Sequence, residues 1–230
     1  MDNYEIIKKH SLKIGIIDAL VFEPKEVCRV VVNFTGMNPN KFDRWSWYYE
    51  RYKAGDETLY ICLKDDDHLF FLNRESCLDY EEQLVSFVKH YLEKHSVSTS
   101  DLYTVGSSMG GYAAIYYAFK LGGKAAIASN PLVNRAAAAL HKFTLWTRKI
   151  DEVGKHFVRL HDYVSRKKNT FVYVESGEYL ADRAASLDLV MSLTRVGNSH
   201  CYVQTDHEEH TDTISKEKLF MLLDTVGKIS

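Results

Sequence analysis

The stretch Asp101–Lys120, DLYTVGSSMGGYAAIYYAFK, constrains the fold more than any other part of the chain. Its β-branched and aromatic residues over Leu102–Val105 predict a short strand, and the apolar run from Met109 onward predicts a helix. Between the two lies Gly106-Ser107-Ser108-Met109-Gly110, a G-x-S-x-G pattern in the strand–turn–helix context that this motif requires. The pattern therefore predicts a sharp turn that projects the Ser108 hydroxyl away from the backbone.

A glycine-rich turn between a strand and a helix can also bind phosphate or simply pack. A dinucleotide-binding loop needs G-x-G-x-x-G, and a Walker loop needs Gly-Lys-Ser/Thr, and this stretch contains neither. The sequence thus favours Ser108 as a nucleophile. The backbone N–H of Met109, at the positive end of the helix, is then the first candidate donor to an oxyanion.

The overall composition suits one globular domain spanning residues 1–230. The chain has 230 residues, of which 46% are hydrophobic, and its net charge of -2 favours neither nucleic acid nor a membrane surface. No apolar run is long enough for a transmembrane segment, and the N-terminus lacks the pattern of a secretory signal. Four cysteines without C-x-x-C spacing are expected to be buried free thiols in the cytoplasm: Cys28, Cys62, Cys77 and Cys201.

Strand and helix patterns alternate along the rest of the chain. Strands are expected at Cys28–Phe34, Thr58–Leu63, Lys124–Ser129, Thr170–Glu175 and His200–Thr205, and helices at Leu78–His95, Ala184–Arg195 and Ser215–Lys228. Apolar residues alternate along Tyr4–Phe22, which predicts an antiparallel hairpin at a sheet edge. The pattern over Asn134–Lys168 predicts an amphipathic helical insert. The order indicates an α/β fold with a mainly parallel, doubly wound sheet and helices on both faces. Loops that follow parallel strands should then share one rim.

A serine hydroxyl needs a base in order to attack a carbonyl, and the base needs an orienting acid. On this architecture the acid follows the serine in the chain, and the histidine comes last. The loop after Thr170–Glu175 supplies Asp182 as the preferred acid, with Glu178 second and Glu175 third.

The loop after the strand His200–Thr205 contains two histidines. His210 is preferred as the base because it lies deeper in the loop, just ahead of the last helix, and His207 remains the alternative. The H-x-x-H pair is a weak metal signal without a third ligand, so no metal site and no cofactor is expected. The second oxyanion donor should come from the loop after Cys28–Phe34, through the backbone N–H of Gly36 or Met37.

Two further segments admit more than one interpretation. The aromatic run Trp45-Ser46-Trp47-Tyr48-Tyr49 could stack on a sugar or line an acyl pocket, but core packing of a helix is favoured. The run Asp65-Asp66-Asp67 could bind a cation, but a solvated loop is favoured.

Taken together, the Gly106–Gly111 turn, Asp182 and the late His210 resemble the α/β-hydrolase superfamily over nearly the whole chain. Within it, the chain resembles small bacterial esterases and capsular polysaccharide O-acetyltransferases that use a Ser-His-Asp triad. That narrower resemblance rests on the GSSxGG turn, Asn130-Pro131 and the helical insert. The chain lacks the HGGG-type oxyanion loop of lipases and has Phe34-Thr35-Gly36-Met37 in its place.

The resemblance implies an acyl-transfer enzyme with a Ser108 acyl-enzyme, Asp182 and His210 completing the triad, and oxyanion donors at Met109 and at Gly36 or Met37. A carboxylic ester hydrolase is the first expectation, acting on a small-molecule or glycan ester. The alternatives are an O-acetyltransferase that modifies a bacterial surface polysaccharide with acetyl-CoA as donor, a thioesterase or peptidase, and a catalytically inactive binding module of the same fold.

Overall fold

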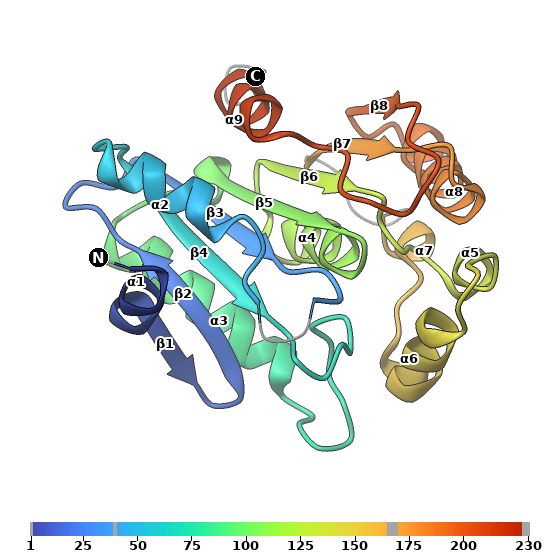
Figure 1. The fold of residues 1–230 in the computed structure, drawn as a ribbon, viewed down its shortest axis with the longest axis horizontal. Coiled ribbons are helices and arrows are strands. Elements are labelled where there is room, and N and C mark those ends of the chain that lie inside the picture. The colour runs from blue at the N-terminus through green and yellow to red at the C-terminus, as the bar shows by residue number, and fades with distance from the viewer. Residues whose placement is uncertain (1, 39–40, 165–169, 227–230) are drawn as a thin grey trace.

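The computed structural model describes residues 2–38, 41–164 and 170–226, and within them eight strands form one sheet in the order β1-β2-β4-β3-β5-β6-β7-β8 (Figure 1). The strand β2 runs antiparallel to β1 and β4, and every other neighbouring pair is parallel. The bounds are β1 Ser11–Ile14, β2 Ile17–Phe22, β3 Arg29–Phe34, β4 Thr58–Lys64, β5 Leu102–Ser107, β6 Ala125–Ser129, β7 Phe171–Ser176 and β8 His200–Gln204.

Helices cover both faces of the sheet. The described helices are α1 Asn3–His10, α2 Trp45–Lys53, α3 Tyr80–Lys94, α4 Met109–Leu121, α5 Arg135–Ala138, α6 Leu145–Val153, α7 Leu160–Val164, α8 Leu180–Val196 and α9 Lys216–Val226, with short 3-10 turns at Thr99–Asp101 and Gly154–His156. Buried side chains of α3, α4 and α8 form one core, and those of α1, α2 and α9 form a second core on the opposite face. The expected doubly wound α/β architecture is confirmed.

The central strands show why their sequences are continuously apolar. In β3, Val30, Val32 and Phe34 belong to the core under α3 and α4, whereas Val31 between them belongs to the core under α2 and α9. Successive side chains of a strand point to opposite faces, and both faces here are covered. A strand in this position therefore needs apolar residues at nearly every position.

The expected hairpin over Tyr4–Phe22 is only partly correct. Residues 11–22 form the hairpin β1–β2, but Asn3–His10 is the helix α1. Its start is a capping box, in which the Asp2 side chain accepts from the Glu5 N–H and the Glu5 side chain accepts from the Asp2 N–H. This cap, and the burial of Ile6 alone on one face, favour a helix over the alternating pattern that suggested a strand.

The insert is helical, but it is not one amphipathic helix. It divides into α5, α6, the 3-10 turn and α7, while residues 165–168 of the expected span lie outside the described residues. Asn134 caps α5 by accepting from the Ala137 N–H, and Gly154 ends α6 with a positive φ of 58°. Polar capping residues and a left-handed glycine thus break the segment into short helices.

The expectation of a solvated loop is correct for Asp66 and Asp67, which are exposed, but wrong for Asp65. Its carboxylate is buried, accepts from the Leu69 and Phe71 N–H groups, and pairs with Arg74 at 3.0 Å. The side chain therefore organises the loop after β4. The cysteines also differ from expectation, since Cys28 and Cys201 are exposed and only Cys62 is buried, although all four are free thiols.

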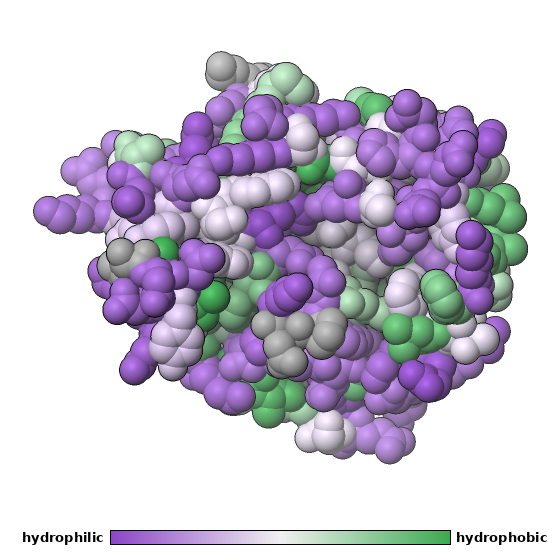
Figure 2. Space-filling view, in the orientation of Figure 1, coloured by the Kyte–Doolittle hydropathy of each residue, from purple (hydrophilic) through white to green (hydrophobic). Residues whose placement is uncertain are grey.

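The exterior is mostly hydrophilic on the face shown in Figure 2, with apolar residues gathered toward the side formed by the insert and α8. Leu140, Phe143, Leu180 and Met191 are exposed in these segments. None of the helices in the described part of the chain combines the length and apolar character that a bilayer crossing requires.

Candidate active site

Ser108 lies at the turn between β5 and α4 in a strained backbone conformation. Its φ is 54° and its ψ is -121°, a region that side-chain-bearing residues rarely adopt. A Cβ on Gly106 would lie 2.1 Å from the carbonyl oxygen of Gly110, so only glycine fits where the strand and the helix cross. The Ser108 N–H donates to the Ser129 carbonyl at 2.9 Å, which fixes the turn to β6.

The serine hydroxyl, His210 and Asp182 form a continuous hydrogen-bonded chain. The Ser108 Oγ lies 2.8 Å from His210 Nε2, and His210 Nδ1 lies 2.6 Å from Asp182 Oδ1. An ionised carboxylate can only accept, so Nδ1 carries the imidazole proton and Nε2 accepts from the serine hydroxyl. These contacts bring together three residues from the segments that follow β5, β7 and β8, on one rim of the sheet.

Asp182 occupies the first turn of α8 and is completely buried. Burial raises the pKa of its carboxyl group, and the hydrogen bond from His210 acts in the opposite direction. Its second oxygen, Oδ2, has no hydrogen-bond partner within the described residues. A carboxylate in this position depends on His210 for its charge stabilisation.

The other candidate acids and the other histidine make different contacts. The ring of His207 contacts the Thr205 hydroxyl at 3.1 Å and is about half exposed. Glu178 is exposed, and its N–H donates to the His207 carbonyl. Glu175 is fully buried and pairs with Lys218 at 2.5 Å, on the side of the sheet covered by α9.

The three expected oxyanion donors line or adjoin one cavity of about 520 Å³ beside Ser108. Met109 begins α4, so its N–H has no acceptor within the helix. The Gly36 N–H already donates to Asp43 Oδ2 at 2.8 Å. The N–H of Met37 makes no hydrogen bond within the described residues. Of the two loop candidates, it is therefore the N–H that is available to donate to an oxyanion.

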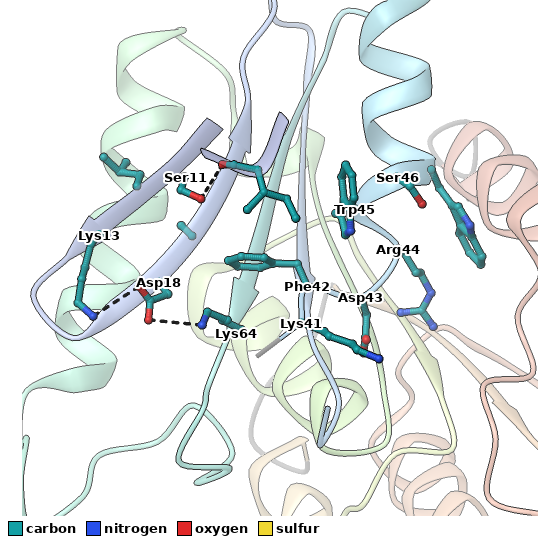
Figure 3. Close-up of a pocket in the computed structure, with 14 residues that line it drawn as sticks. Ser11, Lys13, Asp18, Lys41, Phe42, Asp43, Arg44, Trp45, Ser46 and Lys64 are labelled. Carbon is teal, nitrogen blue, oxygen red and sulfur yellow. Dashed lines mark hydrogen bonds and ion pairs between the residues drawn. The ribbon is translucent and has the colours of Figure 1, made fainter. Parts of the chain in front are cut away.

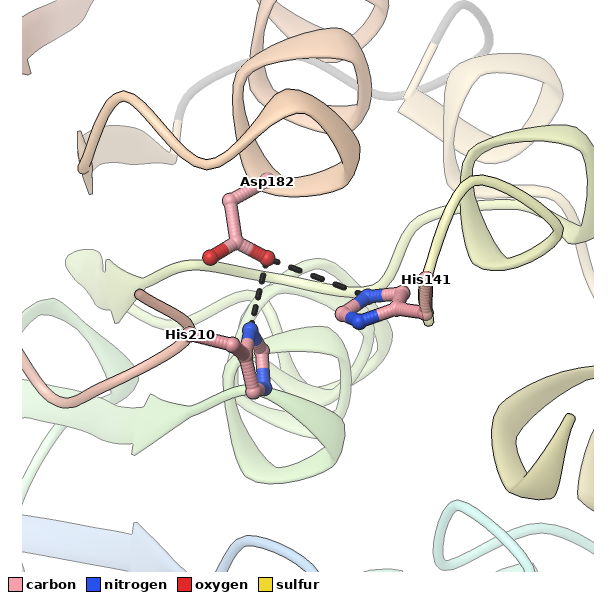
Figure 4. A group of neighbouring side chains, drawn as sticks. All are labelled: His141, Asp182 and His210. Carbon is pink, nitrogen blue, oxygen red and sulfur yellow. Dashed lines mark hydrogen bonds and ion pairs between the residues drawn. The ribbon is translucent and has the colours of Figure 1, made fainter. Parts of the chain in front are cut away.

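His141, which sequence reasoning did not identify, lies beside this chain of hydrogen bonds. Figure 4 shows its ring next to Asp182 and His210, with its Nε2 3.9 Å from Asp182 Oδ1. The rings of His141 and His210 are nearly perpendicular at 4.8 Å between centroids. Burial, followed by the nearby His210, lowers the pKa of His141 to about 4, so the ring is neutral at pH 7. His141 lies in the insert, away from any strand end, and no motif or spacing in the sequence identifies it.

The three side chains could also hold a metal ion. One ligand atom from each of His141, Asp182 and His210 lies within 4.8 Å of the others. To coordinate an ion through Nδ1, however, His210 would have to lose the proton that it donates to Asp182. As they stand, the contacts form a hydrogen-bonded chain from Ser108 through His210 to Asp182, which we call the relay.

Two polar side chains hold the surrounding loops. Asn130 accepts from the Gly177 N–H at 3.1 Å and donates to the Thr211 carbonyl, so it joins the loop before Asp182 to the loop of His210. The buried Arg44 pairs with Asp212, two residues after His210.

No protein-family model and no curated protein sequence matches the chain, but solved structures do. A ferulic acid esterase superposes with a TM-score of 0.71 at 16% identity, over 95% of this chain and 96% of that one. A capsule O-acetyltransferase of Neisseria meningitidis serogroup A gives 0.70 at 10% identity, over 93% and 94%, and a mutant of it is known in complex with CoA. A chain of the Glycosylation Associate Protein complex from Streptococcus agalactiae gives 0.70 at 18% identity, over 94% of this chain but 45% of that one. These similarities establish an α/β-hydrolase-type fold.

Proposed function

We propose that this chain is a serine-dependent acyl-transfer enzyme that hydrolyses carboxylic esters through a Ser108 acyl-enzyme. The observation that carries the proposal is the 2.8 Å contact between Ser108 Oγ and His210 Nε2, on a backbone strained to present that hydroxyl. The ferulic acid esterase of the same fold supports ester chemistry on this scaffold.

In the first half-reaction, Ser108 Oγ attacks the ester carbonyl carbon while His210 Nε2 takes its proton. Asp182 stabilises the imidazolium that forms, and the N–H groups of Met109 and Met37 donate to the oxyanion of the tetrahedral intermediate. Each such donor typically contributes about 3 kcal/mol to transition-state stabilisation. His210 then gives its proton to the departing alcohol, which leaves the acyl group on Ser108.

In the second half-reaction, water attacks the acyl-enzyme and His210 takes a proton from it. The new tetrahedral intermediate collapses, the carboxylic acid leaves, and the proton returns to Ser108 Oγ. The chemistry requires no cofactor beyond these side chains.

A second candidate is O-acetyl transfer, favoured by the match to a capsule O-acetyltransferase over more than nine-tenths of both chains. In this reaction acetyl-CoA would acylate Ser108, and a hydroxyl group of a bacterial surface polysaccharide would replace water in the second half-reaction. The same triad serves both reactions, so the fate of the acyl-enzyme distinguishes them.

The test is intact-protein mass spectrometry during reaction with p-nitrophenyl acetate, with peptide mapping to separate Ser108 from its neighbour Ser107. Ester hydrolysis predicts steady release of nitrophenol with little acetylated protein. Transfer predicts a burst that leaves one stable acetyl group on Ser108, which a glycan hydroxyl then removes.

The control is Ser108→Ala, which should keep the fold but lose turnover and acetylation, a loss of at least about a thousandfold in rate. Full activity of this variant would disprove the proposal. A wild-type chain that neither turns over ester nor reacts with an activated phosphonate would instead indicate a binding module of the same fold.

A further inference from the structure

A second cavity of about 650 Å³ lies between the β1–β2 hairpin, the end of β4 and the segment that leads into α2 (Figure 3). Asp43, Arg44 and Trp47 line both this cavity and the one that contains Ser108. The two cavities are therefore adjacent, and a ligand longer than one small unit could occupy both.

The aromatic side chains of this region divide between core and cavity. Tyr48 is fully buried and stacks on Tyr60, as core packing requires. Phe42, Trp45 and Trp47 are only partly buried, and all three line the second cavity. The expectation of core packing thus holds for Tyr48, while the two tryptophans also present ring surface to a ligand.

Most of the cationic side chains that line the same cavity are already in ion pairs. Lys13, Lys41, Arg44 and Lys64 line it, against two acidic side chains, Asp18 and Asp43. Lys64 and Arg44 are already paired, with Asp66 and Asp212 respectively. Lys41 makes no ion pair with any residue of the described ranges, whereas Lys13, whose side chain is 66% exposed, pairs with Asp18 at 3.5 Å. Among the described lining residues, Lys41 is therefore the cation without an ion pair and the one available to a ligand.

Aromatic faces, lysines and polar acceptors in one cavity match the chemistry of an acidic sugar. The C–H faces of a pyranose ring are apolar and pack against indole, while a lysine pairs with a carboxylate. The hydroxyls of Ser11 and Ser46 and the carboxylate of Asp18 can bond to sugar hydroxyls. A diphosphate such as that of CoA fits less well, because it carries two negative charges and only one lining lysine of the described residues lacks an ion pair.

We propose that the second cavity binds a uronic acid unit of an oligosaccharide whose neighbouring unit lies at Ser108. The identification of the glycan as substrate rests on the proposed function, but binding to the cavity does not require turnover. The structure therefore assigns to this enzyme an acidic polysaccharide, not a small neutral ester, as its substrate class.

The experiment measures binding by titration calorimetry to the Ser108→Ala chain, so that catalysis plays no part. The ligands are a galacturonic acid tetramer, the neutral tetramer maltotetraose, and CoA. Binding is repeated after adding Lys41→Glu, Trp45→Ala or, as a matched control, Lys89→Glu, which makes the same charge change at an exposed site on α3. Thermal unfolding of each variant verifies that it is folded.

The acidic tetramer should bind more tightly than maltotetraose, and more weakly as salt is raised. Its Kd should rise about tenfold with Lys41→Glu and about tenfold with Trp45→Ala, and stay unchanged with Lys89→Glu. Equal binding of the two tetramers, no binding of the acidic one, or tight binding of CoA that Lys41→Glu abolishes would each overturn the proposal. None of these results depends on whether Ser108 forms an acyl-enzyme, so the two proposals can fail separately.

Discussion

The side chain of Asn130 links the two loops that position the proposed acid and base. Asn130 follows β6 with a positive φ of 45°, is almost fully buried, and bonds through one carboxamide to Gly177 and Thr211. Those two residues belong to the loops that lead into Asp182 and out of His210. The geometry of the relay therefore depends on a side chain that takes no part in the chemistry.

Asn130→Ala should lower kcat for p-nitrophenyl acetate about tenfold. Without the carboxamide, the two loops lose a shared partner, and small displacements of reacting groups reduce rate sharply. The free energy of unfolding should fall by about 2 kcal/mol, because the buried N–H of Gly177 and the carbonyl of Thr211 lose their hydrogen bonds. Steady-state kinetics and urea unfolding measure the two effects.

The matched control is Asn198→Ala, another buried asparagine, whose amide donates to Thr170 at the opposite rim of the sheet. It should reduce stability without changing kcat. If both variants changed kcat equally, Asn130 would have a structural role only.

His141 makes the stability of the protein depend on pH. Its pKa is about 4 in the folded chain, against an ordinary value of 6.5, so between these values the unfolded chain binds a proton that the folded chain does not. The free energy of unfolding should therefore fall as the pH falls from 6.5 to 4, by up to about 3 kcal/mol from this residue, and the contribution is fully present above pH 6.5.

Urea unfolding at pH 7 and pH 4.5 tests this prediction in wild type, His141→Gln and His90→Gln. The His141 variant should lose less stability on acidification than wild type, while the exposed His90 on α3 should make no difference. A His141 variant with the wild-type pH dependence would show that another group is responsible.

At the residue scale, the sequence predicted the position of a side chain best where that residue follows a strand. Ser108, Asp182 and His210 could be predicted because strand order brings strand ends to one rim. His141 and Arg44 could not, since both come from segments whose path over the rim is set by tertiary packing. The same limit applies to Gly36, whose N–H is engaged by Asp43, a contact that the sequence does not reveal.

At the scale of elements, α9 is attached to the sheet by an ion pair whose carboxylate, Glu175, is fully buried. Lys218 reaches Glu175 at the end of β7, and the Tyr173 hydroxyl donates to the same carboxylate at 2.5 Å. Leu219 and Leu223 of the same helix are fully buried against the sheet. The helix therefore combines apolar packing with a carboxylate that has little access to water.

Lys218→Met should lower the free energy of unfolding by about 2 kcal/mol, because it removes the ion-pair partner of the buried Glu175. Lys216→Met is the control, since Lys216 lies on the same helix but pairs with the exposed Glu50. Its effect should stay below about 1 kcal/mol. Equal effects in chemical denaturation would mean that the burial of Glu175 does not matter.

Elements themselves differed in how well the sequence predicted them. The strands β3 to β7 were clear because continuous apolar runs leave few alternatives. The helix α1 and the divided insert were not, because capping by Asp2 and Asn134 decides their form and outweighs hydrophobic spacing.

At the scale of the whole molecule, one continuous sheet joins every strand of the described chain, so we expect it to unfold as one unit. The tryptophans give two local reporters, Trp45 and Trp47 on α2 and Trp146 on α6 of the insert. Fluorescence of Trp146→Phe and of the double variant Trp45→Phe/Trp47→Phe should give the same urea midpoint as far-UV circular dichroism. An earlier midpoint for the Trp146 reporter would make the insert a separate unit.

The order of the relay along the chain has a consequence for biosynthesis. A ribosome completes the strained turn at Ser108 about a hundred residues before it adds His210, and β8 and the loop of His210 come after every other strand. On the proposed mechanism, the growing polypeptide therefore carries its nucleophile for a long interval without a base to activate it. On that mechanism, a chain released from the ribosome before His210 is added would not attack the esters around it.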